Sequence, residues 1–127
     1  MHSITIGTRG SKLALRQAHW VAKQLSSIGI KTSIEVIQTT GDKITDVGLA
    51  KVGSESGVKG IFTKEIEQAL LDGRIDIAVH SLKDVPTKID ADLSIAAIPK
   101  RADARDAVVG RRIDELHRGD RIGTSSL

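Results

Sequence analysis

Hydrophobic and polar positions follow three successive patterns over the first 38 residues. Residues 3–7 alternate between polar and β-branched side chains, which predicts a short strand. Apolar residues recur every three or four positions over 13–28, which predicts a helix that Ser11 can cap and Gly29 can end. Residues 32–38 alternate again and predict a second strand. A strand, a helix and a strand in this order are typical of an α/β fold.

The pattern is less regular between residues 39 and 98. Residues 39–60 are rich in glycine and poor in large apolar side chains, which predicts a long loop. Residues 62–71 return to helical spacing, and residues 75–80 are almost all apolar, which is typical of a buried central strand. Residues 93–98 predict one more strand.

Short apolar segments after residue 107 predict the beginning of a second α/β unit. Residues 100–105 are charged or small and suit a hinge or crossover before it. The last segment, residues 121–126, predicts a strand, and a strand without a neighbour would leave an unpaired edge. We therefore expect the sequence to be a truncated portion of a longer chain.

Composition narrows the class of protein. The 127 residues are 39% hydrophobic and contain no apolar run long enough to cross a bilayer, which excludes a disordered tail and a membrane span. The first residues lack the pattern of a signal peptide, so we expect a soluble, cytoplasmic protein. No cysteine is present, which excludes disulfides, thiolate metal sites and a cysteine nucleophile within these residues. The four histidines show no metal-ligand spacing, and we expect no metal.

Charge and aromatic content argue against nucleic acid as a partner. Nineteen basic and 16 acidic residues give a formal net charge of +3, a mild bias rather than a dense basic stripe. Trp20 and Phe62 are the only aromatic residues, so there is no platform on which bases could stack. A few Arg and Lys side chains in one cleft can still bind small carboxylates.

Polar segments follow the predicted strands, where α/β proteins bind ligands. The turn 8–11 lies between a strand and a helix, so its free N–H groups and Arg9 could bind an anion. The alternative is an ordinary capped turn with a solvated arginine. Residues 51–62 are glycine-rich and carry Lys51 and Lys59, but they lack the order of a nucleotide-binding P-loop. Such a stretch is otherwise a flexible linker.

A third polar segment, His80-Ser81-Leu82-Lys83-Asp84, follows the most apolar predicted strand. Burying such groups costs free energy unless they are paired, which favours a functional site. The alternatives are a surface ion pair between Lys83 and Asp84 and a purely structural His80. A Ser-His-Asp hydrolase is disfavoured, because Ser81 follows no nucleophile-elbow pattern and sequence neighbours rarely form a triad.

Several segments in order resemble the porphobilinogen deaminase (hydroxymethylbilane synthase) family, over essentially the whole chain. These segments are TRGSKLALRQA (8–18), TGD (40–42), GIFTKEIE (60–67), DIAVHSLKDVP (76–86) and GTSSL (123–127). The resemblance implies an enzyme of tetrapyrrole and haem biosynthesis. Such an enzyme joins four porphobilinogen molecules head to tail, with loss of ammonia, to give hydroxymethylbilane.

The resemblance also implies a fold and a domain organisation. The fold is α/β and similar to the type II periplasmic binding proteins. Residues 1–99 would be the first segment of an incomplete domain 1 that holds the cofactor and substrate cleft. Residues 100–104 would be the hinge, and residues 105–127 the start of a truncated second domain of similar fold.

Individual residues match positions of known role in the family. Asp84 matches the catalytic aspartate. The residues that match groups holding carboxylates of cofactor or substrate are Arg9, Ser11, Ser81, Lys83, Thr124, Ser125 and Ser126. Those that match substrate-binding or lid positions are Gln17, Lys59 and Phe62.

The cofactor and partners follow from the same resemblance. The family attaches a dipyrromethane cofactor covalently to a cysteine, which this chain lacks, so we expect the chain to be inactive alone. Porphobilinogen is the expected partner, with no nucleic acid and no membrane, and the expected state is a monomer. Residues 51–60 are longer than the family's usual lid, which leaves the roles of Lys51 and Lys59 open.

The reaction explains why a carboxylate belongs at position 84. Expelling ammonia from an aminomethylpyrrole leaves a delocalised azafulvenium cation, which an ionised Asp84 would stabilise as its charge develops. Lys83, if close, would favour the ionised form. Two alternative functions remain. One is a non-catalytic module that binds a small carboxylate in the same cleft, and the other, which depends on net charge alone, is a weak nucleic-acid binder.

Overall fold

The computed structural model describes residues 3–43 and 61–124. In chain order the elements are β1 (Ser3–Thr8), α1 (Lys12–Ser27), β2 (Lys31–Val36), α2 (Thr40–Lys43), α3 (Lys64–Leu71), β3 (Ile77–Ala78) and the 3-10 turns η3 (Leu82–Asp84) and η4 (Ile113–Glu115). The chain divides into two compact units, residues 1–95 and 96–127. No helix in the described part of the chain is long and apolar enough to span a bilayer.

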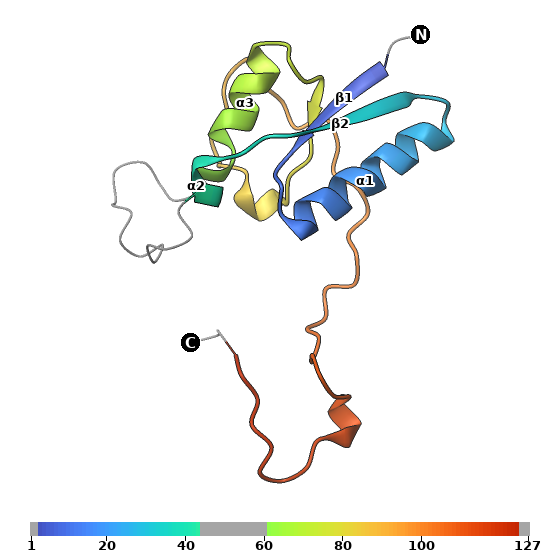
Figure 1. The fold of residues 1–127 in the computed structure, drawn as a ribbon, viewed down its shortest axis with the longest axis vertical. Coiled ribbons are helices and arrows are strands. Elements are labelled where there is room, and N and C mark those ends of the chain that lie inside the picture. Colours follow the sequence, from blue (N-terminus) through green and yellow to red (C-terminus); the bar gives the residue numbers. More distant parts are fainter. Residues whose placement is uncertain (1–2, 44–60, 125–127) are drawn as a thin grey trace. The chain divides into compact units, whose positions relative to one another are not determined.

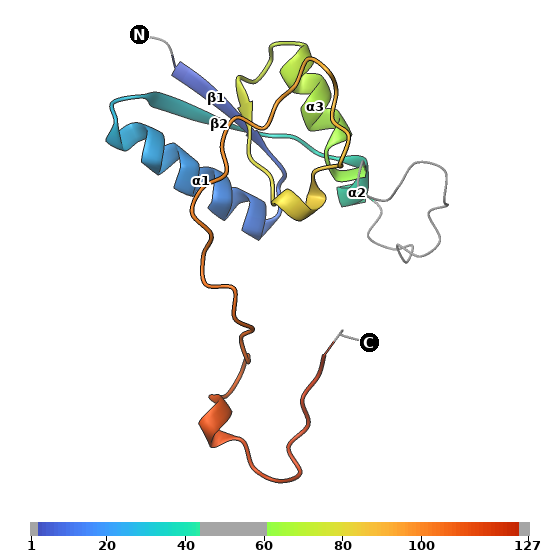
Figure 2. The ribbon, with the colours of Figure 1, turned by 180° about the vertical axis from the view of Figure 1, so that it is seen from behind.

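The first unit is a small parallel sheet with a helix on each face. The strand order is β2-β1-β3, with Ser3 opposite Lys31 and Thr8 opposite Val36 along the β1–β2 pair. Crossovers between parallel strands are right-handed, and the two crossovers here move in opposite directions across the sheet. They therefore place α1 and α3 on opposite faces, as Figures 1 and 2 show.

The core lies between the sheet and α3. Ile66 and Ala69 of α3 pack with Ile37 and Ile75 in one buried cluster. β1 approaches this cluster closely, because a Cβ on Gly7 would lie 2.2 Å from Cδ1 of Ile75. A glycine is needed there unless the Ile75 side chain moves.

The helix ends confirm the sequence prediction. Ser11 precedes α1, and its hydroxyl accepts a hydrogen bond from the Ala14 N–H at 3.2 Å. Gly29 follows the helix with a φ of +83°, a left-handed conformation that glycine adopts without strain. Gly73 ends α3 in the same way, with a φ of +66°. The strands β1 and β2 also form where alternation predicted them.

One predicted strand is shorter than expected, and another does not form. The strand predicted over 75–80 is reduced to Ile77–Ala78, and it lies at the edge of the described sheet rather than at its centre. The strand predicted over 93–98 is not formed, and Ile95 and Ile98 are exposed. A strand is stable only beside a partner that takes its backbone hydrogen bonds. Within residues 3–43 and 61–124, no strand pairs with the outer side of β3.

The described part of the second unit does not form the predicted beginning of a second α/β unit. Its described part, residues 96–124, holds the 3-10 turn η4 and no strand. Apolar side chains there are solvated, with Val109 94% exposed and Ile113 74% exposed. An α/β unit buries its apolar side chains between a layer of strands and a layer of helices. The described part of this segment forms neither layer. The hinge at 100–104 and the domain assignments on either side of it remain predictions.

Candidate functional site

The polar residues gather at one edge of the sheet. Parallel strands end at the same edge, so the segments that follow β1, β2 and β3 meet there. These segments are the turn before α1, the short helix α2, and η3, which lies near the start of α1 in Figures 1 and 2. This is the edge at which α/β proteins bind ligands.

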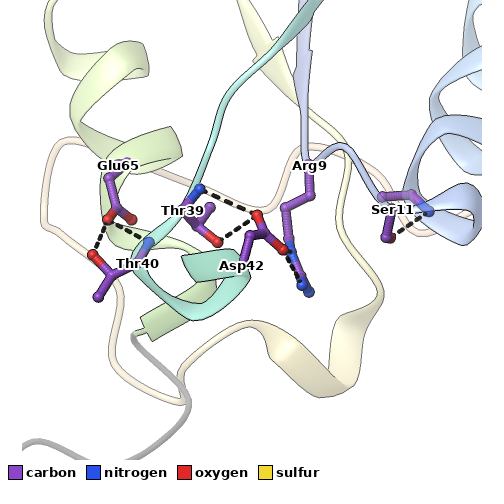
Figure 3. Close-up of polar contacts among 7 residues, drawn as sticks. Arg9, Ser11, Thr39, Thr40, Asp42 and Glu65 are labelled. Carbon is purple, nitrogen blue, oxygen red and sulfur yellow. Dashed lines mark hydrogen bonds and ion pairs between the residues drawn. The ribbon is translucent and has the colours of Figure 1, made fainter. Parts of the chain in front are cut away.

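Arg9 is held between a carboxylate and an aromatic ring. Its Nε and Nη2 atoms donate hydrogen bonds to the same Asp42 oxygen, at 3.1 and 2.6 Å (Figure 3). Its guanidinium carbon lies 4.1 Å from the centre of the Phe62 ring. The Arg9 and Asp42 side chains are 19% and 23% exposed. Arg9 is therefore not the solvated arginine of an ordinary capped turn.

Asp42 is itself anchored. Its second carboxylate oxygen accepts hydrogen bonds from the N–H and the hydroxyl of Thr39, at 3.1 and 2.7 Å (Figure 3). Burial favours the neutral acid, but the bonds from Arg9 and Thr39 outweigh it and hold the pKa of Asp42 below its usual value. Asp42 is thus an anion that stabilises the cation of Arg9.

Two contacts join α2 to the segment around α3. The Thr40 N–H donates to a Glu65 carboxylate oxygen at 2.8 Å, and the Thr40 hydroxyl donates to the same oxygen (Figure 3). Gly41 lies against Phe62, since a Cβ on Gly41 would be 2.1 Å from Cε1 of the ring. The Phe62 ring therefore packs between α2 and Arg9.

The third polar segment contacts α1. The Ser81 hydroxyl donates a hydrogen bond to Oε1 of Gln17 at 3.1 Å, which links the end of β3 to the first half of the helix. Ser11 is exposed, and its hydroxyl oxygen is used by the helix cap. An accepting hydroxyl keeps its own O–H to donate to a ligand.

His80 lies among the charges of the site. Burial lowers the pKa of His80 below its usual value. The positive charge of Arg9 lowers this pKa further, whereas the negative charges of Glu67 and Asp84 raise it without cancelling the effect of burial. Arg9 and Asp84 therefore both lie within electrostatic range of one imidazole. Asp84 is half-buried and Lys83 is exposed, and among the described residues no ion pair joins them.

Not every predicted site residue can be placed. Lys59, Ser125 and Ser126 lie outside the described residues, as does the long stretch 51–60. Thr124 belongs to the second unit.

Two partners of the site were not singled out from the sequence. Asp42 contacts Arg9 and Thr39 holds Asp42, although the sequence predicted no role for either residue and Asp42 was quoted only within the TGD segment (40–42). The available signal was the acidic residue of the TGD segment (40–42), which follows the second predicted strand at the sheet edge where Arg9 also emerges. The described residues contain no group of three or more side chains able to hold a metal ion.

Comparison with known proteins shows the family of this chain. The family model described as "Porphobilinogen deaminase, dipyromethane cofactor binding domain" matches residues 4–127. Curated porphobilinogen deaminases of Shouchella clausii, Syntrophotalea carbinolica and Syntrophobacter fumaroxidans are each 52% identical to the chain. The alignments cover 100%, 98% and 98% of this chain and 41%, 40% and 40% of those proteins.

The chain thus spans about two fifths of the length of these relatives. Half of the positions are identical and the family model covers nearly every residue. The chain belongs to the porphobilinogen deaminase family, in the part that the family model describes as the dipyromethane cofactor binding domain.

Proposed function

We propose that this chain supplies the cofactor-binding and catalytic part of a hydroxymethylbilane synthase. The enzyme joins four porphobilinogen molecules head to tail and releases ammonia at each step. The observation that carries the proposal is Asp84, a half-buried carboxylate that follows β3 at the ligand-binding edge of the sheet, where the turn that carries Arg9 also lies. Membership of the family supports the same reaction.

Asp84 would act on the charge that develops in the reaction. Loss of ammonia from the aminomethyl group leaves a positive charge spread over the pyrrole ring and its exocyclic carbon. A fixed carboxylate near the pyrrole N–H stabilises this charge more than it stabilises the neutral substrate, and that difference lowers the barrier. Removing one such group costs about 10²–10³ in rate.

The remaining residues suit a ligand with several carboxylates. Arg9 and Lys83 supply positive charge, and Ser11 and Ser81 supply hydroxyl groups at the same sheet edge. This donor set fits a dipyrromethane that carries acetate and propionate groups, although the chain has no cysteine to bind it covalently. When bound, the dipyrromethane would supply an electron-rich pyrrole carbon as the nucleophile. Gln17, which contacts Ser81, and Phe62, which contacts Arg9, would form part of the wall of the site.

We infer a type II periplasmic-binding-protein fold for the complete protein. The parallel order β2-β1-β3 with helices on both faces is compatible with the first domain of such a fold. The proposed partner is porphobilinogen, and the proposed state is a cytoplasmic monomer. A structure of a full-length protein carrying residues 1–127 as its N-terminal segment tests the fold.

The function is tested with the same full-length protein. Wild-type protein should release one ammonia for each porphobilinogen consumed and form a linear tetrapyrrole. Asp84→Asn should lose this activity, whereas Asp92→Asn, an exposed position eight residues away, should keep it. A wild-type protein that binds porphobilinogen without releasing ammonia would instead be a non-catalytic carboxylate-binding module.

A further inference from the structure

The hydrogen bonds of Arg9 occupy one edge of its guanidinium. A guanidinium presents two forked edges, one through Nε and one Nη atom and the other through both Nη atoms. Asp42 takes the first edge, because Nε and Nη2 both donate to its Oδ1. Within residues 3–43 and 61–124, no group accepts a hydrogen bond from Nη1. The second edge can therefore receive another carboxylate.

The carboxylate that holds Arg9 cannot turn freely. Its Oδ2 is held by both donors of Thr39, a residue with no exposed surface. The helix that carries Asp42 is tied to α3 through Thr40 and Glu65. A rotation of the Asp42 side chain would break the bonds to Thr39 as well as those to Arg9.

The Phe62 ring restricts Arg9 in the remaining direction. Its centre lies 4.1 Å from the guanidinium carbon, and Gly41 packs against the same ring. Asp42 thus restrains the Nε–Nη2 edge of the guanidinium, and the Phe62 ring limits movement of the guanidinium on its side. Because the Arg9 side chain is already restrained before a ligand binds, it loses less conformational entropy on binding.

We infer that Asp42 is a positioning residue: it orients Arg9 so that the Nη1–Nη2 edge receives a carboxylate of the ligand. Asp42 acts through Arg9 and does not itself touch the ligand. The identity of the ligand rests on the proposed function, and the role of Asp42 does not. The competing possibility is that Asp42 occupies Arg9 and excludes the ligand.

The full-length protein carrying residues 1–127 tests this inference through Asp42→Asn. The amide keeps the shape but loses the charge, and it presents a donor where Thr39 requires an acceptor. KM for porphobilinogen should rise about 10- to 100-fold, the effect of losing a hydrogen bond to a charged group, with kcat within about threefold of wild type. Glu35→Gln is the matched control, because it removes the charge from the Arg74–Glu35 ion pair of 2.8 Å elsewhere on the first unit.

Each other outcome overturns the inference. A lower KM would mean that Asp42 competes with the ligand, and an unchanged KM would mean that the pair only stabilises the fold. In an Arg9→Lys background, Asp42→Asn should change KM less than about twofold, because lysine has no fork to orient. An undiminished effect in that background would also contradict the inference. The intact mass of each variant verifies equal cofactor loading.

A second readout does not depend on activity. In nuclear magnetic resonance spectra of the chain 1–127, the Arg9 Nε–H should exchange slowly with water in the wild type and rapidly in Asp42→Asn. Slow exchange in the variant would show that another group orients Arg9. If the full-length protein releases no ammonia while this readout behaves as expected, the proposed function fails and the positioning role stands.

Discussion

The orientation and protonation of individual charged residues in the site depend on neighbours that are distant in sequence. Arg9 and Asp42 are 33 positions apart, and Glu67 and Arg9, from two other segments of the first unit, act on the pKa of His80. Residue types could be predicted from the sequence, since Arg9, Ser81 and Asp84 all follow predicted strands. Their partners could not, because the Arg9–Asp42 pair depends on how two loops meet after folding.

His80 makes the stability of the fold depend on pH. Burial lowers its pKa from the ordinary 6.5, so the unfolded chain binds a proton more readily than the folded chain does. Stability should therefore fall as pH decreases from 6.5 towards the lower pKa of the folded state. Urea unfolding of wild type and His80→Gln between pH 7.5 and pH 5 measures this.

The variant supplies the control for that measurement. His80→Gln cannot titrate, so its unfolding midpoint should fall less than that of the wild type over the same range. Three charges act on the imidazole: Glu67 and Asp84 oppose the lowering of its pKa, and Arg9 reinforces it. Equal pH dependence in both proteins would show that His80 is not buried as described.

Helices and strands differ in how much of them could be predicted. α1 and α3 have local signals at both ends, namely Ser11, Gly29 and Gly73, and each forms where predicted. β3 and the strand predicted over 93–98 depend on neighbouring strands, which periodicity does not reveal. The short helix α2 lies in a glycine-rich stretch, and its bonds to Arg9 and Glu65 hold it in place.

The contact between α2 and Phe62 predicts a strong effect at Gly41. In Gly41→Ala the new Cβ would lie 2.1 Å from Cε1 of the ring, so the Phe62 ring must shift and its contact with Arg9 must change. Overpacking of this kind costs about 1–3 kcal/mol of unfolding free energy. Gly123→Ala, where a Cβ meets nothing within 4 Å, is the matched control and should change stability little. Equal effects of the two substitutions, measured by urea unfolding, would contradict the packing.

At the scale of the whole molecule, the two units differ in the structure they contain. Residues 1–95 bury a core between a sheet and two helices, whereas the described part of residues 96–127 buries almost no apolar side chain. The sequence pattern predicted an α/β unit in the first and the beginning of another in the second. The pattern describes which residues could be buried, and burial also requires a second layer to pack against.

This difference predicts the order of proteolysis. Among the cleavage sites in residues 3–43 and 61–124, trypsin should cut earlier after residues of the second unit such as Arg101 and Arg105, because the backbone there is exposed and outside helices and strands. Cleavage after Lys23, within α1, should be at least about tenfold slower. Mass spectrometry of the early fragments measures both rates. Early cleavage inside α1 would contradict the difference in structure between the two units.

The most direct test of the account is the single-turnover rate of ammonia release in a full-length protein carrying residues 1–127. The account predicts that Asp84→Asn lowers this rate about 10²–10³-fold while the affinity for porphobilinogen changes less than about threefold, because Asp84 stabilises charge that exists only after ammonia begins to leave. A single-turnover rate near that of the wild type would contradict the assignment of Asp84 as the catalytic carboxylate.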